Sequence, residues 1–206
     1  MPVNIKVTVV ISKRLQEAAS RAPQVVLNHL RKAMNASILE TETRIKEYIT
    51  EIGLIKDGRL RNSIHGRIVS ANIRQIKGEV ATANVKYARI QEYGGTIVPK
   101  NGQALAIPFN KESAQVQMYG SLRNVEGLYV IRRGANEGFG GAAFLVSSKN
   151  PKLGWTLVKS VYIKEKRYMR TGFDRARPRI LEFFRLATQR ALKAVFGVGE
   201  GTASDE

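Results

Sequence analysis

The chain of 206 residues contains no cysteine and only two histidines. The lack of cysteine excludes disulfide bonds, thiolate metal ligands and thiol nucleophiles. His29 and His65 do not form a spaced pair, so we interpret each as a structural or surface residue. No apolar run approaches the roughly 20 residues of a membrane span, and the apolar core of residues 3–11 is too short and too β-branched for a signal peptide. We therefore expect no membrane association.

Acidic residues are scarce relative to basic ones. The chain has 34 Lys and Arg against 17 Asp and Glu, which gives a net charge of +17. The excess is global, because residues 1–103 carry 17 basic and 8 acidic side chains and residues 104–206 carry 17 and 9. Such a balance predicts proximity to a polyanion, with nucleic acid the usual one, but a solubility device or a surface matched to acidic proteins would give the same charge.

A long N-terminal helix is the clearest secondary-structure prediction. From Pro23 to Ile52, apolar residues recur at steps of three and four, and Gly53 supplies a left-handed stop. Before this helix, residues 3–11 predict a strand and residues 12–20 a short helix. After it, Asp57 could cap a helical turn over residues 57–64.

The middle of the chain predicts short strands. Residues 64–74 and 78–85 read as two strands joined by a turn near Lys77 and Gly78. The stretch YARIQEYGG predicts a helical turn that ends at glycine, followed by extended pieces in TIVPK and QALAIPF, whose prolines favour a sheet edge or corner. In this turn we expect Tyr87, Ile90 and Tyr93 to anchor the turn against the sheet.

The second half predicts a glycine-rich arm and a last helix. Residues 109–160 form the predicted arm or insertion, with GLYVIRR and AAFLVSS as a hairpin around GANEGFGG. Residues 157–163 predict a returning strand. An apolar stripe from Ile180 to Val195 predicts the C-terminal helix, with Pro178 near its start and Gly197 after its end. We expect a single α+β domain over residues 1–196, with both long helices on a small antiparallel sheet, and a flexible tail over 197–206.

Catalytic and phosphate-binding patterns are absent from the sequence. Neither GANEGFGG nor YGGT has the spacing of a phosphate loop or precedes a helix, so both predict turns. Glu92 is the one acid inside a glycine-bounded turn. It could be a general base, but no catalytic partner is in view. The alternative is a charge-assisted bond to an arginine or a backbone amide, within the subunit or between subunits.

Residues 164–193 form a basic segment, with ten basic and three acidic side chains. Such spacing suits contact with phosphates without sequence specificity, or with an acidic protein, and it equally suits the solvated face of an amphipathic helix. The candidate contact residues are Lys164, Lys166, Arg167, Arg170, Arg175, Arg177 and Arg179.

Three separated segments occur in the following order along the chain: GRLRNSI (58–64), YARIQEYGGTIVPK with ALAIPF (87–109), and SVYIKEKRYMRTGFDRA (160–176). Together they resemble the tail-completion or neck proteins of tailed phages, also known as head–tail joining, virion morphogenesis or minor tail proteins. The middle segment is the most specific. The third departs from the pattern, because it keeps Ile163, Arg167 and Tyr168 but lacks the two prolines that the family commonly has there.

The resemblance implies a structural, non-enzymatic late protein that needs no cofactor. It implies a homo-oligomeric ring at the head–tail junction, six-fold by similarity with twelve-fold as the alternative. The implied partners are the head connector or stopper and the tail terminator or tail tube, with passing double-stranded DNA nearby. The implied location is the virion neck, and the host cytoplasm during assembly. The implied interface residues are Tyr87, Glu92, Tyr93, Gly94, Gly95, Ile97, Pro99, Arg167 and Tyr168.

Three functions remain open from the sequence. The first is this structural role in virion assembly. The second is a basic protein whose main task is to contact DNA without sequence specificity, which the charge of +17 and the segment 164–193 favour. The third is a hydrolytic site at Glu92 and the glycine pair, for which no further catalytic residue can be named.

Overall fold

The computed structural model describes residues 3–54, 58–72, 74–100, 104–119, 122–132 and 143–197. The fold is α+β, with a long N-terminal helix and a long C-terminal helix packed together with small antiparallel sheets, as the sequence predicts. The chain divides into two compact units, where we expected a single domain. The first unit comprises Met1–Gly94 and Glu165–Glu206, and the second comprises Gly95–Lys164, so it includes the predicted arm together with residues on both sides of it.

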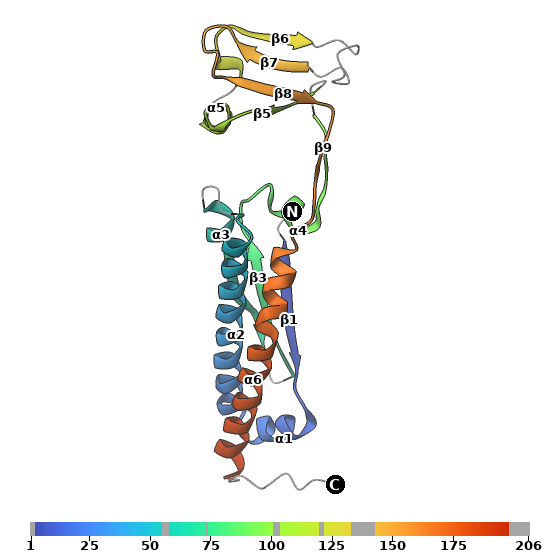
Figure 1. Ribbon diagram of the computed structural model, residues 1–206. Helices are drawn as coiled ribbons and strands as arrows, with labels where there is room; N and C mark the ends of the chain where they lie inside the picture. The colour runs from blue at the N-terminus through green and yellow to red at the C-terminus, as the bar shows by residue number, and fades with distance from the viewer. Residues whose placement is uncertain are drawn as a thin grey trace. The chain divides into compact units, whose positions relative to one another are not determined.

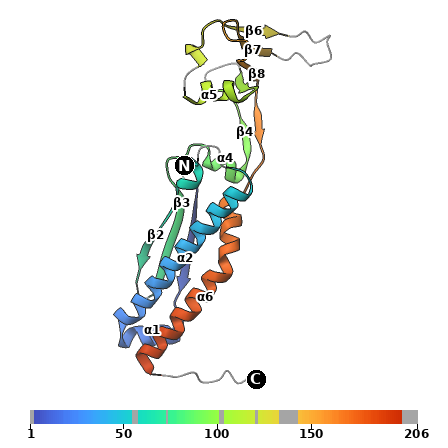
Figure 2. The same ribbon diagram turned by 60° about the vertical axis from the view of Figure 1, so that its left-hand side comes forward.

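The first unit combines a three-stranded sheet with two long helices (Figure 1). The strands β1 (Asn4–Val10), β3 (Gln75–Thr82) and β2 (Ile64–Ala71) form an antiparallel sheet in that spatial order. Helices α2 (Pro23–Glu51) and α6 (Tyr168–Phe196) lie side by side (Figure 2). The short helices are α1 (Lys13–Arg21), α3 (Arg59–Asn62) and α4 (Ala88–Tyr93).

Helix α2 forms where its apolar stripe predicts it. Pro23 occupies the first turn, where its missing N–H costs no hydrogen bond. Gly53, with φ of 68°, takes the left-handed conformation just after the helix. The predicted Asp57 cap lies outside the described residues; the turn itself is α3, which follows Gly58 with φ of 73°.

Three glycines allow the layers of this unit to approach closely. A Cβ at Gly172 of α6 would lie 2.6 Å from the Ile45 Cα of α2, so the two helix backbones meet there. A Cβ at Gly66 would lie 2.3 Å from the Ile38 side chain, and a Cβ at Gly78 would lie 2.6 Å from the Met34 side chain. Because both glycines lack this atom, the sheet can pack closely on α2. The core therefore depends on missing side chains as well as on buried apolar ones.

The turn between β2 and β3 is not at Lys77 and Gly78, and the prediction was wrong there. Both residues lie within β3, and the chain reverses between Asn72 and Gln75. The Asn72 side-chain oxygen accepts bonds from the Arg74 and Gln75 amides, which closes the turn. Gly78 is present for close packing against Met34 and Ile38, rather than for a turn.

Helix α6 begins ten residues before Pro178, so the prediction that this proline lies near the helix start was wrong. Pro178 is inside the helix and leaves the Asp174 carbonyl without its usual amide donor. The C-terminal end agrees with the prediction, because Gly197 has φ of 67° and its amide donates to the Lys193 carbonyl.

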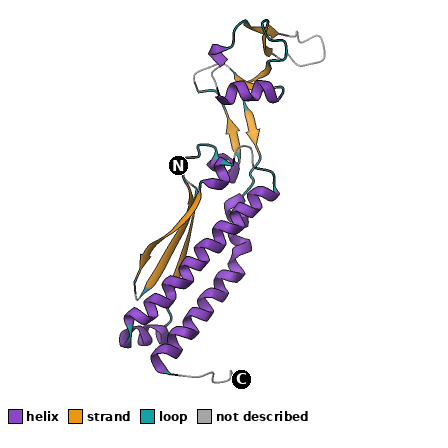
Figure 3. Ribbon diagram, turned by 90° about the vertical axis from the view of Figure 1, so that its left-hand side faces the viewer, coloured by secondary structure: helices purple, strands orange, loops and turns teal. Residues whose placement is uncertain are grey.

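The second unit is made of short strands and one helix (Figure 3). Strands β4 (Gly95–Ile97) and β9 (Val161–Ile163) form a two-stranded ribbon. A four-stranded antiparallel sheet has the order β5 (Leu105–Pro108), β8 (Gly154–Val158), β7 (Ala143–Ser147), β6 (Leu128–Arg132). Helix α5 (Lys111–Tyr119) and the 3-10 turn η1 (Leu122–Asn124) follow β5.

The predicted hairpin is confirmed, because β6 pairs with β7 from Leu128 opposite Ser147 to Arg132 opposite Ala143. Its connection GANEGFGG lies outside the described residues. The predicted single strand over residues 157–163 is instead parts of two strands, β8 and β9, in separate sheets. Trp155 is fully buried, and the Phe109 ring covers Gly154 and meets the edge of Phe144, with 5.7 Å between the ring centroids.

Candidate functional site

The helical turn expected in YARIQEYGG is present as α4, and Gly94 ends it with φ of 68°. Of the three expected anchors, Ile90 is half-buried and the two tyrosines are exposed. Tyr87 and Tyr93 are 42% and 62% exposed, so neither tyrosine is buried against the sheet. The buried residues of α4 are Ala88 and Glu92. The large side chain that α4 buries is therefore a carboxylate, where we expected tyrosine rings.

Glu92 binds the first turn of α6. One carboxylate oxygen accepts a hydrogen bond of 2.7 Å from the Met169 amide, and the other accepts one of 3.2 Å from the Arg170 amide. This confirms the expected charge-assisted bond to a backbone amide within the subunit. The first amides of a helix have no intrahelical acceptor and carry a partial positive charge. A carboxylate at this position accepts their hydrogen bonds and interacts favourably with that charge. Glu92 thus caps the first turn of α6.

The charge of Glu92 is subject to opposing effects. Burial raises the pKa of its carboxyl above the ordinary value of 4.5, while the two amide bonds and the nearby Arg167 and Arg170 guanidinium groups act to lower it. Burial has the larger effect, so the pKa is raised overall. The structure places no other acid or histidine in hydrogen-bond contact with Glu92 among the described residues.

Tyr168 joins the same junction from the other side. It is fully buried, and its hydroxyl donates a hydrogen bond of 3.3 Å to the Ala88 carbonyl. Burial raises the pKa of Tyr168, with the negative charge of Glu92 adding to the effect and a hydrogen bond with Thr82 opposing it. The Thr82 hydroxyl also accepts a bond of 3.1 Å from the Val3 amide. Tyr168 therefore connects α6, α4 and the end of β3.

The first motif reaches the same place through β2. Ile64 lies opposite Thr82 in the sheet, and the Ala83 amide donates a 3.0 Å bond to the Ser63 carbonyl. Leu60 is only 2% exposed. Residues of the three separated motifs thus converge at one end of the first unit, through Ser63 and Ile64, Ala88 and Glu92, and Tyr168.

The chain leaves the first unit after Gly94 and returns at Glu165. Within the first unit, the Lys166 amide donates to the Gln91 carbonyl at 2.7 Å and the Arg167 amide to the Glu92 carbonyl at 3.1 Å. Arg167 has φ of 47°, an uncommon conformation for a residue other than glycine. These bonds hold the outgoing and returning segments side by side at the start of α6.

Three predicted interface residues lie in the second unit. Gly95 and Ile97 belong to β4, opposite Ile163 and Val161 of β9. Ile97 is 39% exposed, and Pro99 is half-buried just beyond the strand. Two-stranded ribbons are marginally stable by themselves.

The predicted cationic residues divide into two groups. Arg167 pairs with Glu165, Arg175 binds Glu51 through two nitrogens, and Arg179 pairs with Glu182 at 2.9 Å. Arg175 also stacks 4.6 Å from the centre of the Tyr48 ring. Among the described residues, Lys164, Lys166, Arg170 and Arg177 are exposed and make no side-chain ion pair within 4.0 Å. Within the described residues these four side chains are therefore not neutralised by an ion pair, although the Arg170 charge also acts on the Glu92 carboxyl.

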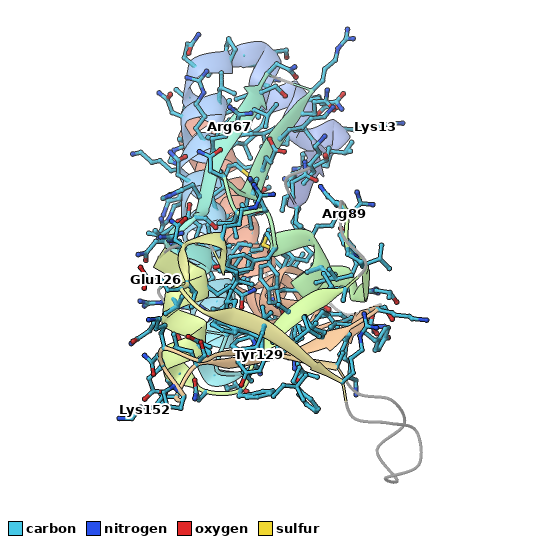
Figure 4. The ribbon with its side chains drawn as sticks, turned by 90° about the horizontal axis from the view of Figure 1, so that it is seen from above. Lys13, Arg67, Arg89, Glu126, Tyr129 and Lys152 are labelled. Atoms are coloured by element: carbon cyan, nitrogen blue, oxygen red, sulfur yellow. The ribbon has the colours of Figure 1, made fainter. Side chains whose placement is uncertain are left out.

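A groove lined by both charged and apolar residues was missed in the sequence. It lies at the β2–β3 end of the first-unit sheet and includes His65, Arg67, Glu79, Asn84 and Lys86. Glu79 accepts a 2.7 Å bond from the Asn4 amide group and lies 3.6 Å from the Arg67 guanidinium (Figure 4 labels Arg67). The outward alternation of His65, Arg67 and Val69 along β2 is the signal that could have indicated this face.

Comparison of the chain with protein-family models, with curated proteins and with solved structures finds no match. Within the described part of the chain, no group of three or more His, Asp or Glu side chains is placed to hold a metal ion. The described helices include none that is long and apolar enough to cross a membrane.

Proposed function

We propose that this protein is a structural virion component that forms a ring at the head–tail junction of a tailed phage and completes or joins the tail to the head. The observation that carries the proposal is the convergence of the three motif segments at the start of α6. These segments are widely separated along the chain, and the resemblance to neck proteins rests on all three.

The chemistry of the junction suits a scaffold for assembly. Glu92 and Tyr168 use their polar atoms on backbone groups of the same unit, at the Met169, Arg170 and Ala88 positions. Such bonds fix the start of α6 against α4 within the first unit. Tyr87 and Tyr93, which flank this corner, are exposed and provide aromatic contact surface of the kind that protein interfaces use.

The proposed partners are other copies of this chain, the head connector or stopper, and the tail terminator or tail tube. The experiment is genetic: an early stop codon in this gene, in the phage that encodes it, with the protein supplied or withheld from a plasmid. We expect DNA-filled heads and separate tails without the protein, and joined particles with it. Normal virions made in its complete absence would contradict the proposal.

A second candidate function is contact with DNA by a basic protein without sequence specificity. The observation that favours it is the set of four exposed cations that make no ion pair among the described residues: Lys164, Lys166, Arg170 and Arg177. Lysine and arginine at such positions can neutralise phosphates and release counterions. The two functions are compatible, because a ring at the neck encloses the path of the DNA.

A further inference from the structure

The sheet of the first unit has two faces of different character. Gly66 of β2 and Gly78 of β3 pack on α2 side chains, and Figure 3 shows the sheet along one side of the two long helices. Successive residues of a strand point to opposite faces, so the residues that alternate with these glycines lie on the face away from α2. We call it the outer sheet face. Its side chains include those of Lys6, His65, Arg67, Lys77, Glu79 and Ala81.

The outer sheet face is cationic. Lys6 and Arg67 are exposed and Lys77 is half-buried, and Lys86, just beyond β3, is exposed as well. The three lysines make no side-chain ion pair within 4.0 Å among the described residues. The acid of this face is Glu79, which already accepts a 2.7 Å bond from an asparagine of β1 and lies 3.6 Å from the Arg67 guanidinium. Four cationic side chains thus surround one acid that is already bonded.

The groove at the β2–β3 end of this sheet opens on the outer face. Its lining includes Arg67, Glu79 and Ala81 of that face, together with Ala83 and Lys86 from the segment after β3. Its volume is about 830 Å³, within the range of roughly 300–1,000 Å³ that is typical of ligand sites. The two alanines have small side chains, and the arginine and the lysine supply charged donors. Such a lining suits a ligand that carries carboxylates.

One stretch of the chain has the complementary charge. Residues 198–206, VGEGTASDE, contain the acids Glu200, Asp205 and Glu206 and no lysine or arginine. No other run of nine residues in the sequence has three acids without a basic residue. Copies of a chain with net charge +17 repel each other unless an acidic segment of one meets a cationic surface of the other. Within this chain, charge complementarity therefore selects the acidic stretch 198–206 as the occupant.

Chain length makes this contact intermolecular. Lys86 lies two residues before Ala88, whose carbonyl accepts a bond from the first residue of α6. Helix α6 has 29 residues, so it carries the chain about 42 Å away from this junction at 1.5 Å per residue. Glu206 is nine residues after Gly197 and Glu200 only three, which corresponds to at most about 32 Å and 11 Å of extended chain. The acidic stretch cannot bring its acids into the groove of its own chain.

We propose that the acidic stretch 198–206 of one copy docks in the groove and on the outer sheet face of the next copy, with its acids against Lys6, Arg67 and Lys86. The contact joins two different surfaces of the chain, so it is heterologous and can repeat until a ring closes. The inference deepens the proposed function and rests on the assembly of copies that it contains, because it names the two surfaces through which the copies meet.

Charge reversal on either side of the contact tests the docking in the full chain. One variant carries Glu200→Lys, Asp205→Lys and Glu206→Lys, and the other, the groove variant, carries Arg67→Glu and Lys86→Glu. We expect each alone to self-associate at least about tenfold more weakly than the wild type in sedimentation equilibrium at roughly 50 mM salt, where charges are little screened. The two variants change the net charge in opposite directions, so a general charge effect cannot weaken both.

A one-to-one mixture of the two variants should regain association, because the acidic stretch of the groove variant meets the unaltered groove of the other. Lys13→Glu with Arg14→Glu, at exposed positions of α1, is the matched control and should leave self-association unchanged. Circular dichroism confirms that each variant folds. A wild type that stays monomeric, or a mixture that fails to regain association, would overturn the inference. So would a groove variant that self-associates like the wild type but loses binding to DNA or to an acidic protein.

The same variants separate this inference from the proposed function. If copies with the reversed acidic stretch still form a ring and bind head or tail components, the docking is wrong and the proposed function stands. If association depends on the two sets of charges as we expect, but the protein binds no head or tail component, the docking stands and the neck function is wrong.

Discussion

Glu92 is a buried carboxylate that two backbone amides at the start of α6 hold in place. Its position on α4 is 77 residues away from Met169 in the chain, so the bond ties together segments that the sequence separates widely. The free amides of a helix's first turn are usually capped by the side chain of the residue just before the helix. Here the cap comes from another motif, and the start of α6 therefore depends on the corner at Tyr87–Gly94.

The first prediction concerns stability. Glu92→Ala leaves the Met169 and Arg170 amides without their acceptor in a buried site, and we expect the free energy of unfolding to fall by about 1–3 kcal/mol. Urea denaturation followed by circular dichroism measures the change. Glu17→Ala, on an exposed glutamate of α1, is the control and should change the free energy by less than about 0.5 kcal/mol. Equal effects of the two substitutions would argue against the capping role.

The second prediction concerns pH. The pKa of Glu92 is raised in the folded protein above its ordinary value of 4.5, so the folded state holds the proton more tightly than the unfolded state. The stability that this group contributes is therefore greatest at low pH, and it falls as pH rises from 4.5 through the folded pKa. Glu92→Gln removes the ionisable carboxyl, so this pH-dependent contribution to stability is absent from the variant.

Urea denaturation between pH 4 and 7 tests this directly, at roughly half-unit steps across the window in which a raised carboxyl pKa would lie. The free energy of unfolding of the wild type minus that of Glu92→Gln should decrease with rising pH and then level off. A difference that increases with pH would mean that the amide bonds outweigh burial.

At the scale of elements, the contact between α2 and α6 depends on Gly172. The third prediction is that Gly172→Ala lowers the free energy of unfolding by about 1–3 kcal/mol, because the new Cβ would strike the α2 backbone at Ile45. Helix propensity alone predicts the opposite sign, a gain of about 1 kcal/mol. Ala194→Gly, at an exposed position of α6, measures the propensity effect in the same helix. A stabilised Gly172→Ala protein would contradict close packing at this point.

The elements that the sequence predicts well are those set by local pattern. The stripe from Val26 to Ile49 is enough to place α2, and the alternation of β1 is enough to place the first strand. The elements placed wrongly depend on distant contacts. Gly78 was predicted to be a turn residue because its packing against Met34 and Ile38 is not visible in the local sequence. Pro178 was predicted to lie near a helix start because the cap that Glu92 gives the helix, about ten residues earlier in the chain, comes from a distant segment.

The candidate site shows the same division. The motif order and the glycine turn after Tyr93 could be predicted from the sequence, and so could a backbone amide as a partner for Glu92. That Glu92 is buried in the corner while Tyr87 and Tyr93 are exposed could not be predicted. Which amides bind it, those of Met169 and Arg170, could not be predicted either, because every residue except proline carries the same amide group.

Over the whole molecule, the basic residues behind the net charge of +17 include some that pair with acids and, among the described residues, others that do not. The fourth prediction is that replacing Lys164, Lys166, Arg170 and Arg177 by glutamine weakens binding to duplex DNA and reduces the slope of log K against log salt. Each phosphate that these side chains no longer neutralise should reduce the magnitude of that slope by about 0.9. Fluorescence anisotropy between roughly 50 and 200 mM salt measures it.

The control for this experiment removes the same charge elsewhere. Replacing Lys13, Arg14, Arg31 and Lys32 by glutamine lowers the net charge by an equal amount on α1 and α2, where the four side chains are exposed. We expect this variant to keep most of the salt dependence. If the two sets weaken binding equally, the charge acts as a whole and these four cations make no preferred contact with DNA.

We propose that this chain is an assembly component of a phage neck. Negative-stain imaging and native mass spectrometry of the purified protein, alone and mixed with head connector and tail proteins of a tailed phage, are the measurements that decide between assembly and its absence. We expect a closed ring, six-fold by resemblance to neck proteins or twelve-fold, that binds at least one of these components. A protein that stays monomeric and binds no head or tail component would contradict it.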